Sequence, residues 1–320
     1  MRKRKSHNND MVNENITRLE IIGHIGVEEH ILINPPVKYG TNVVSKELAI
    51  EILERTVMIG GAAAFGYLTT LELGAQASIF TCVGRNDLFA EKIIRTLNKN
   101  LNYSNKYIRK ELTNYFLSIW DKNSKQKQLY FHIDSDLSID DVKNIEKTES
   151  DALLLFGLTQ PSTTIEILKR YKKFGIPVSF VPNQTIIEYR QDHESILSQI
   201  KLLFVNQAEA LNFTKTSSID EAIKVLIRLI HTYPSIAAIC VTQGDQCVLL
   251  IEQEHSVKKI RLPNRIEFTL GGGDVFASAV TTMFFSGENI EIACHKSTSI
   301  INALLETLNP FSSYNPLVLQ

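Results

Sequence analysis

The sequence is poor in cysteine, in net charge and in long apolar runs, and each shortage excludes a class of protein. Its 320 residues include four cysteines without a CxxC or Cys/His pair, so we expect buried thiols in a reducing, cytoplasmic compartment rather than a disulfide framework. The formal net charge of −1 gives no overall attraction to nucleic acid or to a membrane surface. No apolar run approaches the roughly 18 residues of a membrane span. A small-molecule partner is therefore expected, with no nucleic acid and no membrane.

The chain begins with a short basic run, MRKRKSHNND, which lacks the apolar segment that a secretory signal requires. A nuclear or nucleic-acid role is one interpretation of this run, and a solvated terminus is favoured over it. We expect residues 1–17 to be a disordered basic tail and residues 18–320 to form a single domain. An apolar fraction of 44% and a charged fraction of 22% are ordinary for a globular protein with a large core.

Most of the chain alternates between apolar, strand-like segments and helical patterns. Helical segments separate four strands of this kind, DALLLFG, IPVSFVP, IKLLFVN and IAAICVTQG. Strands that are apolar throughout and alternate with helices predict a mostly parallel sheet with helices on both faces. The expected fold is therefore an α/β fold, a three-layer α/β/α sandwich.

Two segments do not fit this alternation. One is the early strand at residues 27–34, and the other is the segment 113–134, which reads as a hairpin turning around residues 122–124. We expect a small β lid built from about residues 27–40 and 113–134. Because an exposed sheet edge invites pairing, the same lid also offers a surface for a homodimer.

Three consecutive glycines, Gly271, Gly272 and Gly273, precede Asp274 in the stretch TLGGGDVFASA. Apolar residues at helical spacing follow Asp274, so the glycines open a helix. First-turn amides of a helix lack internal partners and carry partial positive charge, which favours a bound phosphate. A carboxylate would repel that phosphate unless it serves another molecule, such as a hydroxyl about to attack the phosphate. The competing interpretation is a helix N-cap with glycines for a tight turn.

Two further polar pairs follow predicted strands, where ligands of parallel α/β sheets bind. Asn206 and Glu209, three residues apart at a helix start, suit Mg²⁺ held through water, but they equally suit a helix capping box. Thr242 and Gly244 follow the next strand in VTQGD, where a plain exit from strand to turn is the alternative.

Taken in order, these motifs resemble the ribokinase-like family of carbohydrate and nucleoside kinases, often called the PfkB family. The stretch IGGAAAFGYLTTLELGAQASIFTCVG, residues 59–84, is similar to the family's N-terminal signature with its Gly-Gly substrate loop. FTLGGGDVFASAV is similar to its C-terminal signature, which usually has a GAGD core. Asn206 and Glu209 match an Asn-x-x-Glu motif, and residues 242–244 match a Thr-x-Gly motif. The resemblance covers roughly residues 18–308 in the right order.

The resemblance implies an ATP- and Mg²⁺-dependent kinase for a hydroxyl of a small sugar-like or nucleoside substrate. Asp274 would be the general base, and the amides of the three glycines would stabilise charge on the transferring phosphoryl group. The remaining implied contacts are Mg²⁺ at Asn206 and Glu209, the nucleotide at Thr242 and Gly244, adenine near Asn302, and the substrate at Gly60 and Gly61.

The sequence departs from the family pattern at three positions. Glu28 stands where the family usually has an Asp that binds substrate hydroxyls, and an exposed strand carboxylate is the alternative. Phe65 replaces the usual Asn of the substrate loop, which predicts either an atypical sugar pocket or a substrate with an aromatic or apolar group. Phe268 replaces a polar residue before the glycine turn, so the family's frequent monovalent-cation site is left uncertain.

Two more candidate substrate residues follow from position alone. Asn183 follows the strand at residues 177–181 and either touches phosphate or substrate or is a turn residue. His132 either lines the lid over the substrate or packs structurally among its aromatic neighbours. No Arg/Lys cluster lies near the Gly-Gly loop, with Arg85 and Arg109 the nearest candidates, so a sugar phosphate is the less favoured substrate. Sugar and nucleoside both stay open.

The predicted function is ATP-dependent phosphotransfer with Asp274 as general base. A catalytically inactive sugar- or nucleotide-binding regulator of the same fold is the second interpretation, and the altered substrate loop motivates it. The retained Asp274, Asn206 and Glu209 argue against it. A dinucleotide-dependent oxidoreductase is the third, because GHIG at residues 23–26 follows a strand, but the rest of GxGxxG and its ribose-binding acid are missing.

Overall fold

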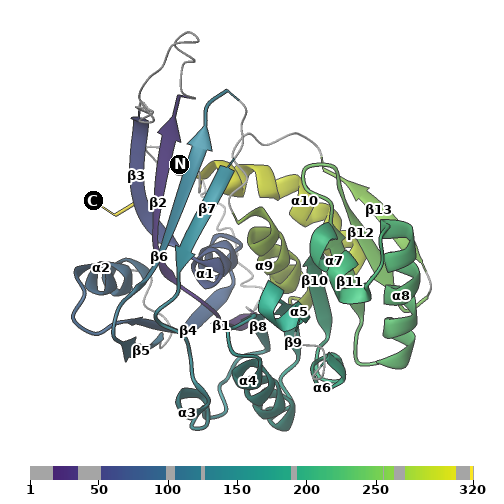
Figure 1. Cartoon of the computed structure of the whole chain (residues 1–320). Helices are drawn as coiled ribbons and strands as arrows, with labels where there is room; N and C mark the ends of the chain where they lie inside the picture. Colours follow the sequence, from purple (N-terminus) through teal and green to yellow (C-terminus); the bar gives the residue numbers. More distant parts are fainter. Residues whose placement is uncertain are drawn as a thin grey trace, which may run out of the picture.

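The computed structural model describes residues 17–34, 52–98, 105–123, 127–188, 193–254, 256–262, 271–307 and 318–319. These residues form a nine-stranded sheet with helices on both faces and a separate four-stranded sheet (Figure 1). The α/β architecture predicted from the alternating pattern is confirmed.

The nine-stranded sheet, called the main sheet below, has the strand order β13-β12-β11-β10-β9-β8-β1-β4-β5. All of its neighbouring pairs from β5 to β11 are parallel, and only the β11–β12 and β12–β13 pairs at one edge are antiparallel, so β12 alone runs against the other strands. Every residue of β8 is buried, as expected for a central strand covered on both faces. The strands are β1 (Arg18–Ile22), β4 (Gln76–Gly84), β5 (Lys106–Lys110), β8 (Ala152–Phe156), β9 (Val178–Val181), β10 (Leu202–Asn206), β11 (Ala238–Thr242), β12 (Cys247–Glu252) and β13 (Val257–Arg261).

Two apolar clusters, one on each face of the main sheet, form the core. The first packs β-strand side chains against α1 (Ala62–Glu72), α2 (Leu88–Leu97), α9 (Gly272–Phe285) and α10 (Ile290–Thr307). The second packs the opposite side chains against α3 (Ile139–Val142), α4 (Pro161–Phe174), α5 (Gln184–Glu188), α6 (His193–Leu197), α7 (Gln207–Thr214) and α8 (Ile219–Thr232). Adjacent residues of one strand divide between the clusters, as Ile21 and Ile22 do, because successive side chains point to opposite faces.

Two predictions about membranes and thiols can be compared with this core. All four cysteines are free and buried, as expected. None of the helices in the described residues combines the length and apolarity needed to cross a membrane.

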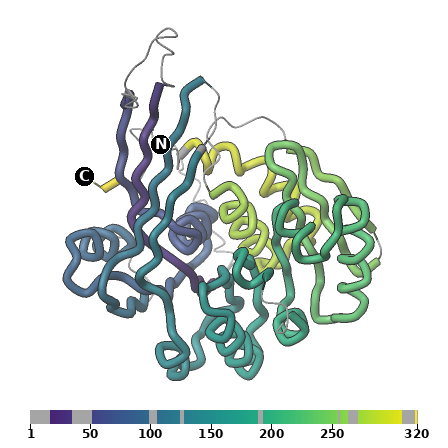
Figure 2. Tube along the Cα trace, in the orientation of Figure 1, coloured from purple at the N-terminus to yellow at the C-terminus, as the bar shows by residue number. Residues whose placement is uncertain are grey.

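The four-stranded sheet, called the small sheet below, has the order β3-β2-β6-β7 and extends from one side of the molecule (Figure 2). Its strands are β2 (Gly26–Ile33), β3 (Ile52–Gly60), β6 (Asn114–Asp121) and β7 (Lys127–His132). The β6–β7 hairpin is antiparallel, as predicted, and β2 pairs in parallel with β6. Near the other end of the chain, the amide of Leu319 donates to the carbonyl oxygen of Val57 in β3 at 2.9 Å.

Three elements differ from what the sequence predicts. The sequence analysis assigned no strand to β3 or β5. β3 mixes charged and apolar residues, and β5 is a short, charged edge strand, KYIRK. Between β9 and β10, where the alternating pattern predicts a helical segment, the described residues contain two short helices, α5 and α6, instead of one continuous helix. Residues 1–16, 35–40 and Phe268, for which a tail, the end of the lid and a cation-site change were predicted, lie outside the described residues.

Candidate active site

The predicted catalytic turn and one predicted substrate residue lie side by side where α1 contacts α9. The N-cap of α9 is Gly271, whose φ of 63° is in the left-handed region that favours glycine. A Cβ atom on Gly271 would lie 2.8 Å from Cδ2 of Phe65, so the aromatic ring packs directly against the turn. Asp274 is in the first turn of α9. The ring of Phe65 therefore borders the segment that carries the predicted base.

The predicted substrate loop, Gly60 and Gly61, joins β3 to α1. Gly61 is the N-cap of α1 with φ of 91°, and a Cβ atom there would lie 2.6 Å from the carbonyl oxygen of His24. The amide of Ala63 donates to that same oxygen at 3.2 Å. A Cβ atom on Gly60 would overlap the carboxylate of Glu28. The loop is thus held between Glu28 on the small sheet and the first turn of α1.

Glu28 is buried, with 4% of its surface exposed, which excludes the alternative of an exposed strand carboxylate. The hydroxyl of Ser118 donates to Oε1 of Glu28 at 3.3 Å, and Nε2 of His30 lies 3.7 Å from the same oxygen. Behind it, Nε1 of Trp120 donates to Nδ1 of His30 at 3.2 Å. His30 is two residues from Glu28 on β2, whereas Ser118 and Trp120 come from β6, so these two contacts depend on strand pairing and could not be predicted from the local sequence.

The predicted nucleotide residues lie at the ends of two adjacent parallel strands. Asn206 of β10 is the register partner of Thr242 of β11. Two residues before Asn206 and on the same strand face, Phe204 contacts Phe276 of α9 edge-on, with ring centroids 6.2 Å apart. Asn206 and Thr242 therefore lie at the end of the sheet face that α9 covers.

Asn206 and Glu209 form the capping box that was the alternative to a Mg²⁺ site. The amide of Glu209 donates to Oδ1 of Asn206, and the amide of Asn206 donates to a carboxylate oxygen of Glu209, both at 2.8 Å. Burial raises the pKa of the Glu209 carboxyl, even though the hydrogen bonds from Asn206 act in the opposite direction. The cap occupies one oxygen of each side chain, so a role in Mg²⁺ binding stays a prediction.

Gly244 lies in the turn after β11 with φ of 58°, again in the left-handed region. A Cβ atom at this position would have no neighbour within 4 Å, so the turn conformation rather than close packing accounts for the glycine. The side-chain amide of Gln243 donates to the side chain of Gln207 at 2.8 Å, which ties this turn to the start of α7. Thr242 and Gly244 therefore border a turn that is fixed to the neighbouring helix.

Asn302 of α10 presents a buried side-chain oxygen that has no hydrogen-bond partner among the described residues. Leu305 lies one helical turn further on, and its Cδ1 atom would be 3.6 Å from a Cβ atom on Gly272. The unpaired oxygen is therefore on the part of α10 that borders the glycine turn. A buried acceptor without a donor fits an incoming donor such as the amino group of an adenine.

The side chain of Asn183 is engaged with backbone groups. Its amide nitrogen donates to the carbonyl oxygens of Gly157 and Leu158, both at 3.1 Å, and its oxygen accepts from the amide of Ile186 at 2.9 Å. It thereby joins the end of β8 to the start of α5, which is the behaviour of a turn residue. Its predicted contact with substrate is untested.

His132 lies apart from the other predicted substrate residues. Its Nε2 atom is 2.9 Å from a carboxylate oxygen of Asp134, and its side chain is 72% exposed. His132 pairs across the hairpin with Tyr115, whereas Glu28 pairs with Phe116. Successive residues of a strand face opposite ways, so His132 and Glu28 lie on opposite faces of the small sheet.

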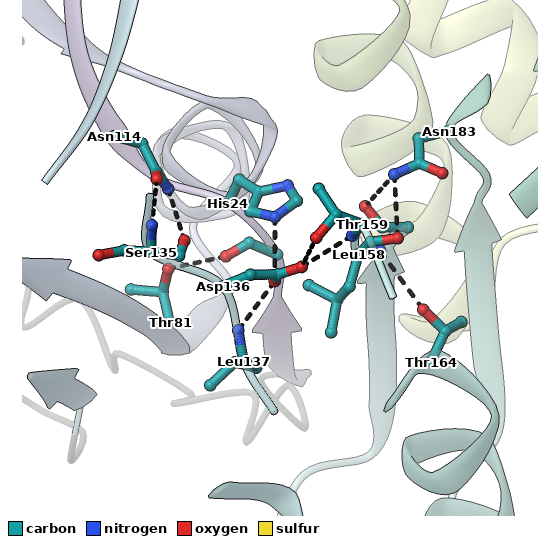
Figure 3. A network of polar contacts seen from close by, with 12 residues as sticks. His24, Thr81, Asn114, Ser135, Asp136, Leu137, Leu158, Thr159, Thr164 and Asn183 are labelled. Carbon is teal, nitrogen blue, oxygen red and sulfur yellow. Dashed lines mark hydrogen bonds and ion pairs between the residues drawn. The ribbon is translucent and has the colours of Figure 1, made fainter. Parts of the chain in front are cut away.

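A polar network that the sequence analysis missed lies at the carboxyl ends of β1 and β8 (Figure 3). Nε2 of His24 is 3.0 Å from Oδ1 of Asp136, which follows the small sheet in the chain. The other carboxylate oxygen of Asp136 accepts hydrogen bonds from the amide and the hydroxyl of Thr159. Burial alone would raise the pKa of Asp136, but the hydrogen bonds from His24 and Thr159 outweigh it and hold that pKa below its usual value.

A second part of this network fixes the small sheet to the main sheet. The side-chain amide of Asn114 donates to the carbonyl oxygens of Ile25 at 3.1 Å and Ser135 at 2.8 Å, and its oxygen accepts from the amide of Ser135 at 2.8 Å. The hydroxyl of Thr81 in β4 donates to the carbonyl oxygen of Gly23 at 2.7 Å. The crossover from β1 to β2 is therefore held on both sides.

The first turn of α9 is open to its surroundings, as the predicted phosphate-binding role requires. Gly273 is exposed, and a Cβ atom there would meet nothing within 4 Å, so the first turn of α9 borders open space. The described residues contain no group of three or more His, Cys, Asp or Glu side chains that could hold a metal. Arg109, one of the nearest candidate phosphate ligands, pairs instead with Glu91 at 2.7 Å.

Known proteins that are similar to this chain include kinases of sugars and nucleosides. A curated cytidine kinase from Thermococcus kodakarensis is 24% identical over 249 residues, which are 74% of this chain and 84% of that protein. The ribokinase of Arabidopsis thaliana, solved with ribose and ATP, has a TM-score of 0.71 and 16% identity, covering 94% of this chain and 96% of that one. A nucleoside kinase from Methanocaldococcus jannaschii has a TM-score of 0.67 and 17% identity, covering 95% of both chains.

These structural likenesses establish a ribokinase fold for the chain. The family assignment rests on a separate finding, because the model of the pfkB family carbohydrate kinases matches residues 37–299, which is most of the sequence. The motifs at residues 59–84, 206–209, 242–244 and 268–280 all fall within the matched segment, whereas Glu28 and Asn302 lie outside it. The chain belongs to the pfkB family of carbohydrate kinases.

Proposed function

We propose that this protein transfers the γ-phosphoryl group of ATP to a hydroxyl of a small sugar or nucleoside, with Asp274 as general base. Family membership supports a kinase that uses ATP. The observation that carries the rest is the contiguity of the predicted residues. Glu28 borders Gly60 on one side of the substrate loop, and Phe65 borders the turn before Asp274 on the other.

Each group has a task in this reaction. Glu28, buried and fixed by its neighbours, accepts hydrogen bonds from substrate hydroxyls beside the Gly-Gly loop. Asp274 accepts the proton of the attacking hydroxyl, and the amides at the start of α9 stabilise the negative charge on the transferring phosphoryl group. Phosphoryl transfer depends mainly on positioning and electrostatics, which such fixed groups provide.

The donor nucleotide fits along the ends of β10 and β11. Thr242 and Gly244 border it, and the unpaired oxygen of Asn302 accepts a hydrogen bond from the adenine amino group. Asn206 and Glu209 would be the residues that hold Mg²⁺, through its water molecules, since this ion keeps part of its hydration shell. When bound, Mg²⁺ neutralises charge on the phosphates.

The acceptor pocket favours a substrate with one apolar face. Phe65 replaces the hydrogen-bonding Asn usual at this position, and its ring, only 3% exposed, packs against Gly271, so this side of the pocket is apolar. A nucleoside base or a deoxygenated sugar carbon suits such a contact, and the similarity to a cytidine kinase supports including nucleosides among the acceptors tested.

The small sheet also supports the homodimer that was expected from the sequence. Its strand β7 exposes three large apolar side chains, Leu129, Tyr130 and Phe131. A row of exposed apolar residues on an edge strand favours association with a second sheet. Dimerisation through this sheet is part of the proposal.

A substrate panel tests the proposed activity. We would measure ADP release from ATP and Mg²⁺ in the presence of D-ribose, D-fructose, cytidine, uridine, adenosine or inosine, and identify the phosphorylated product by mass spectrometry. The proposal expects at least one acceptor to be phosphorylated. Tight binding of an acceptor and of ATP with no product would instead favour the inactive regulator of the same fold.

Replacing Glu209 with Gln is expected to raise the Mg²⁺ concentration for half-maximal rate by about tenfold, because the shape of the cap is kept while the charge that attracts the hydrated ion is lost. In the wild-type protein the raised pKa of Glu209 means that the carboxylate is protonated at a higher pH than an ordinary Glu, so the Mg²⁺ requirement should rise as the pH falls through that pKa. Steady-state rates over a Mg²⁺ titration provide the measurement. Glu288→Gln, beyond the C-terminal end of α9, is the control. An unchanged Mg²⁺ titration in the Glu209 variant would leave the residue a helix cap only.

A further inference from the structure

His24 lies directly against the substrate loop, although the sequence associates it with no kinase motif. It belongs to the GHIG stretch between β1 and β2. Its carbonyl oxygen accepts a hydrogen bond from the amide of Ala63 at 3.2 Å and lies 2.6 Å from the position that a Cβ atom on Gly61 would occupy. The residue is therefore fixed to the first turn of α1 at Ala63, three residues after Gly60, which borders Glu28.

The ring of His24 is held by one of its nitrogens. Nε2 lies 3.0 Å from Oδ1 of Asp136, and the side chains of His24 and Asp136 are only 13% and 12% exposed. The lowered pKa of Asp136 keeps its carboxyl group ionised, so it accepts hydrogen bonds and donates none. Nε2 of His24 is buried and lies at ion-pair distance from Oδ1 without the geometry of a hydrogen bond, so the ionised carboxylate holds this edge of the ring by electrostatic attraction and favours a hydrogen on Nε2.

Asp136 is in turn fixed by backbone and side-chain donors from two segments. The amide of Leu137 donates to Oδ1 at 2.8 Å, the amide of Thr159 donates to Oδ2 at 2.8 Å, and the hydroxyl of Thr159 also donates to Oδ2. With both oxygens occupied, the carboxylate cannot turn without breaking these bonds. The orientation of the imidazole is thus set by the end of β8 and by the segment that leaves the small sheet (Figure 3).

The second ring nitrogen, Nδ1, is left for another partner. Within the part of the chain that the structure describes, Nδ1 makes no hydrogen bond. It is also absent from the fully buried polar atoms that lack a partner, so it is accessible to a ligand. The ring that carries it has a fixed orientation. A neutral imidazole accepts a hydrogen bond at Nδ1, and an imidazolium donates one there. A hydroxyl group is the ligand that satisfies both states, because it donates and accepts.

We propose that His24 is a specificity-determining residue of the acceptor site, whose Nδ1 binds a substrate hydroxyl, and that Asp136 is the positioning residue that holds it. This inference rests on the proposed kinase function. It adds to that function a second hydroxyl contact, on the β1–β2 crossover, besides Glu28. A purely structural ion pair between the small sheet and the main sheet is the competing account, and it predicts different kinetics.

The two amide replacements of His24 separate these accounts. In His24→Gln the side-chain amide falls near the position of Nε2, so the contact with Asp136 is kept and the contact of Nδ1 is lost. In His24→Asn the amide falls near Nδ1, so the reverse holds. His231→Gln, on an exposed part of α8, is the control. For each protein we would measure KM and kcat for cytidine and D-ribose, KM for ATP, and the unfolding temperature.

The proposal expects His24→Gln to raise the KM for the better of the two acceptors about tenfold, a factor equivalent to about 1.4 kcal/mol, with an unchanged KM for ATP. His24→Asn should retain more of the acceptor affinity than His24→Gln. Asp136→Asn should raise the same KM, and the double variant His24→Gln/Asp136→Asn should be little worse than either single variant, because both remove one contact. Acceptor analogues that lack one hydroxyl provide a further measurement. Removing the hydroxyl that His24 binds should weaken binding to the wild-type protein but not to His24→Gln.

The outcomes also separate this inference from the function on which it rests. Suppose the wild-type protein is active and His24→Gln has the same acceptor KM, or differs only by a lower unfolding temperature. Either result would overturn the role of His24 and leave the kinase assignment intact. Absence of both turnover and binding of every acceptor in the wild-type protein would overturn the two together.

Discussion

Asp274→Asn is expected to lower kcat by about 10²–10⁴, the contribution typical of a general base, while the protein stays folded and still binds its acceptor. Asn has the same shape as Asp, so the first turn of α9 and the packing of Phe65 against Gly271 should be preserved. What is lost is the ability to take a proton from the attacking hydroxyl. The measurement is single-turnover phosphorylation of the best acceptor, together with acceptor and ATP affinity by calorimetry.

The structure excludes the alternative of Asp274 as the N-cap, because Gly271 is the cap and no side chain of the described residues bonds to it. A purely structural role for Asp274 in the first turn would act through the helix dipole, so its loss would change the unfolding free energy by about 0.3–1 kcal/mol and leave the rate per folded molecule unchanged. Asp140→Asn is the matched control, because that carboxylate is 86% exposed and lies on α3. A loss of kcat in the Asp274 variant that is no larger than in the Asp140 variant would remove Asp274 from the mechanism.

The parts of the site that the sequence predicted are those whose signal is local. The glycine turn before α9 was predicted because glycines, a carboxylate and a helical pattern are contiguous in the chain. The ends of β10 and β11 were predicted because each apolar strand stops at a polar residue, and the parallel register then brings Asn206 beside Thr242. Such features depend on a few neighbouring residues, so their physical meaning can be derived before the fold is known.

The missed parts depend on contacts between distant segments. His30 and Trp120 are 90 residues apart, and neither has a neighbour in sequence that indicates their hydrogen bond. Asp136 follows a hairpin and reads as a loop carboxylate until the fold places it against His24. The burial of Glu28 belongs to the same class, because alternation along β2 leaves open which face of the strand will be covered. Tertiary pairing decides these points, and a single sequence carries no record of it.

The network around the β1–β2 crossover has a consequence for the lid that was predicted from sequence. The small sheet is joined to the main sheet by Asn114, which binds the carbonyl oxygens of Ile25 and Ser135, and by the contact of His24 with Asp136. These bonds hold the base of the small sheet, where β2 and β6 begin. They do not reach the far end of that sheet. If the small sheet closes over a substrate, as predicted, we expect the pivot near Gly26 and Asn114, next to Glu28.

Gly271→Ala is expected to destabilise the protein by about 2–3 kcal/mol and to abolish measurable turnover. A left-handed conformation costs a residue with a Cβ atom about 1–2 kcal/mol, and φ at Gly271 is 63°. The new methyl group would also lie 2.8 Å from the ring of Phe65, which must shift or force the turn away from it. Because the ring is buried between α1 and α9, the strain reaches the segment that carries Asp274.

Gly74→Ala separates the backbone term from the packing term. Gly74 has φ of 78°, but a Cβ atom there would meet nothing within 4 Å, and the residue lies at the other end of α1 from the site. It should lose only the backbone term, about 1–2 kcal/mol, and keep full activity per folded molecule. Urea unfolding curves and kcat for both variants provide the comparison. The opposite result would be a Gly271→Ala variant as stable and as active as Gly74→Ala. The turn before Asp274 would then tolerate displacement, which contradicts the fixed geometry that base catalysis by Asp274 requires.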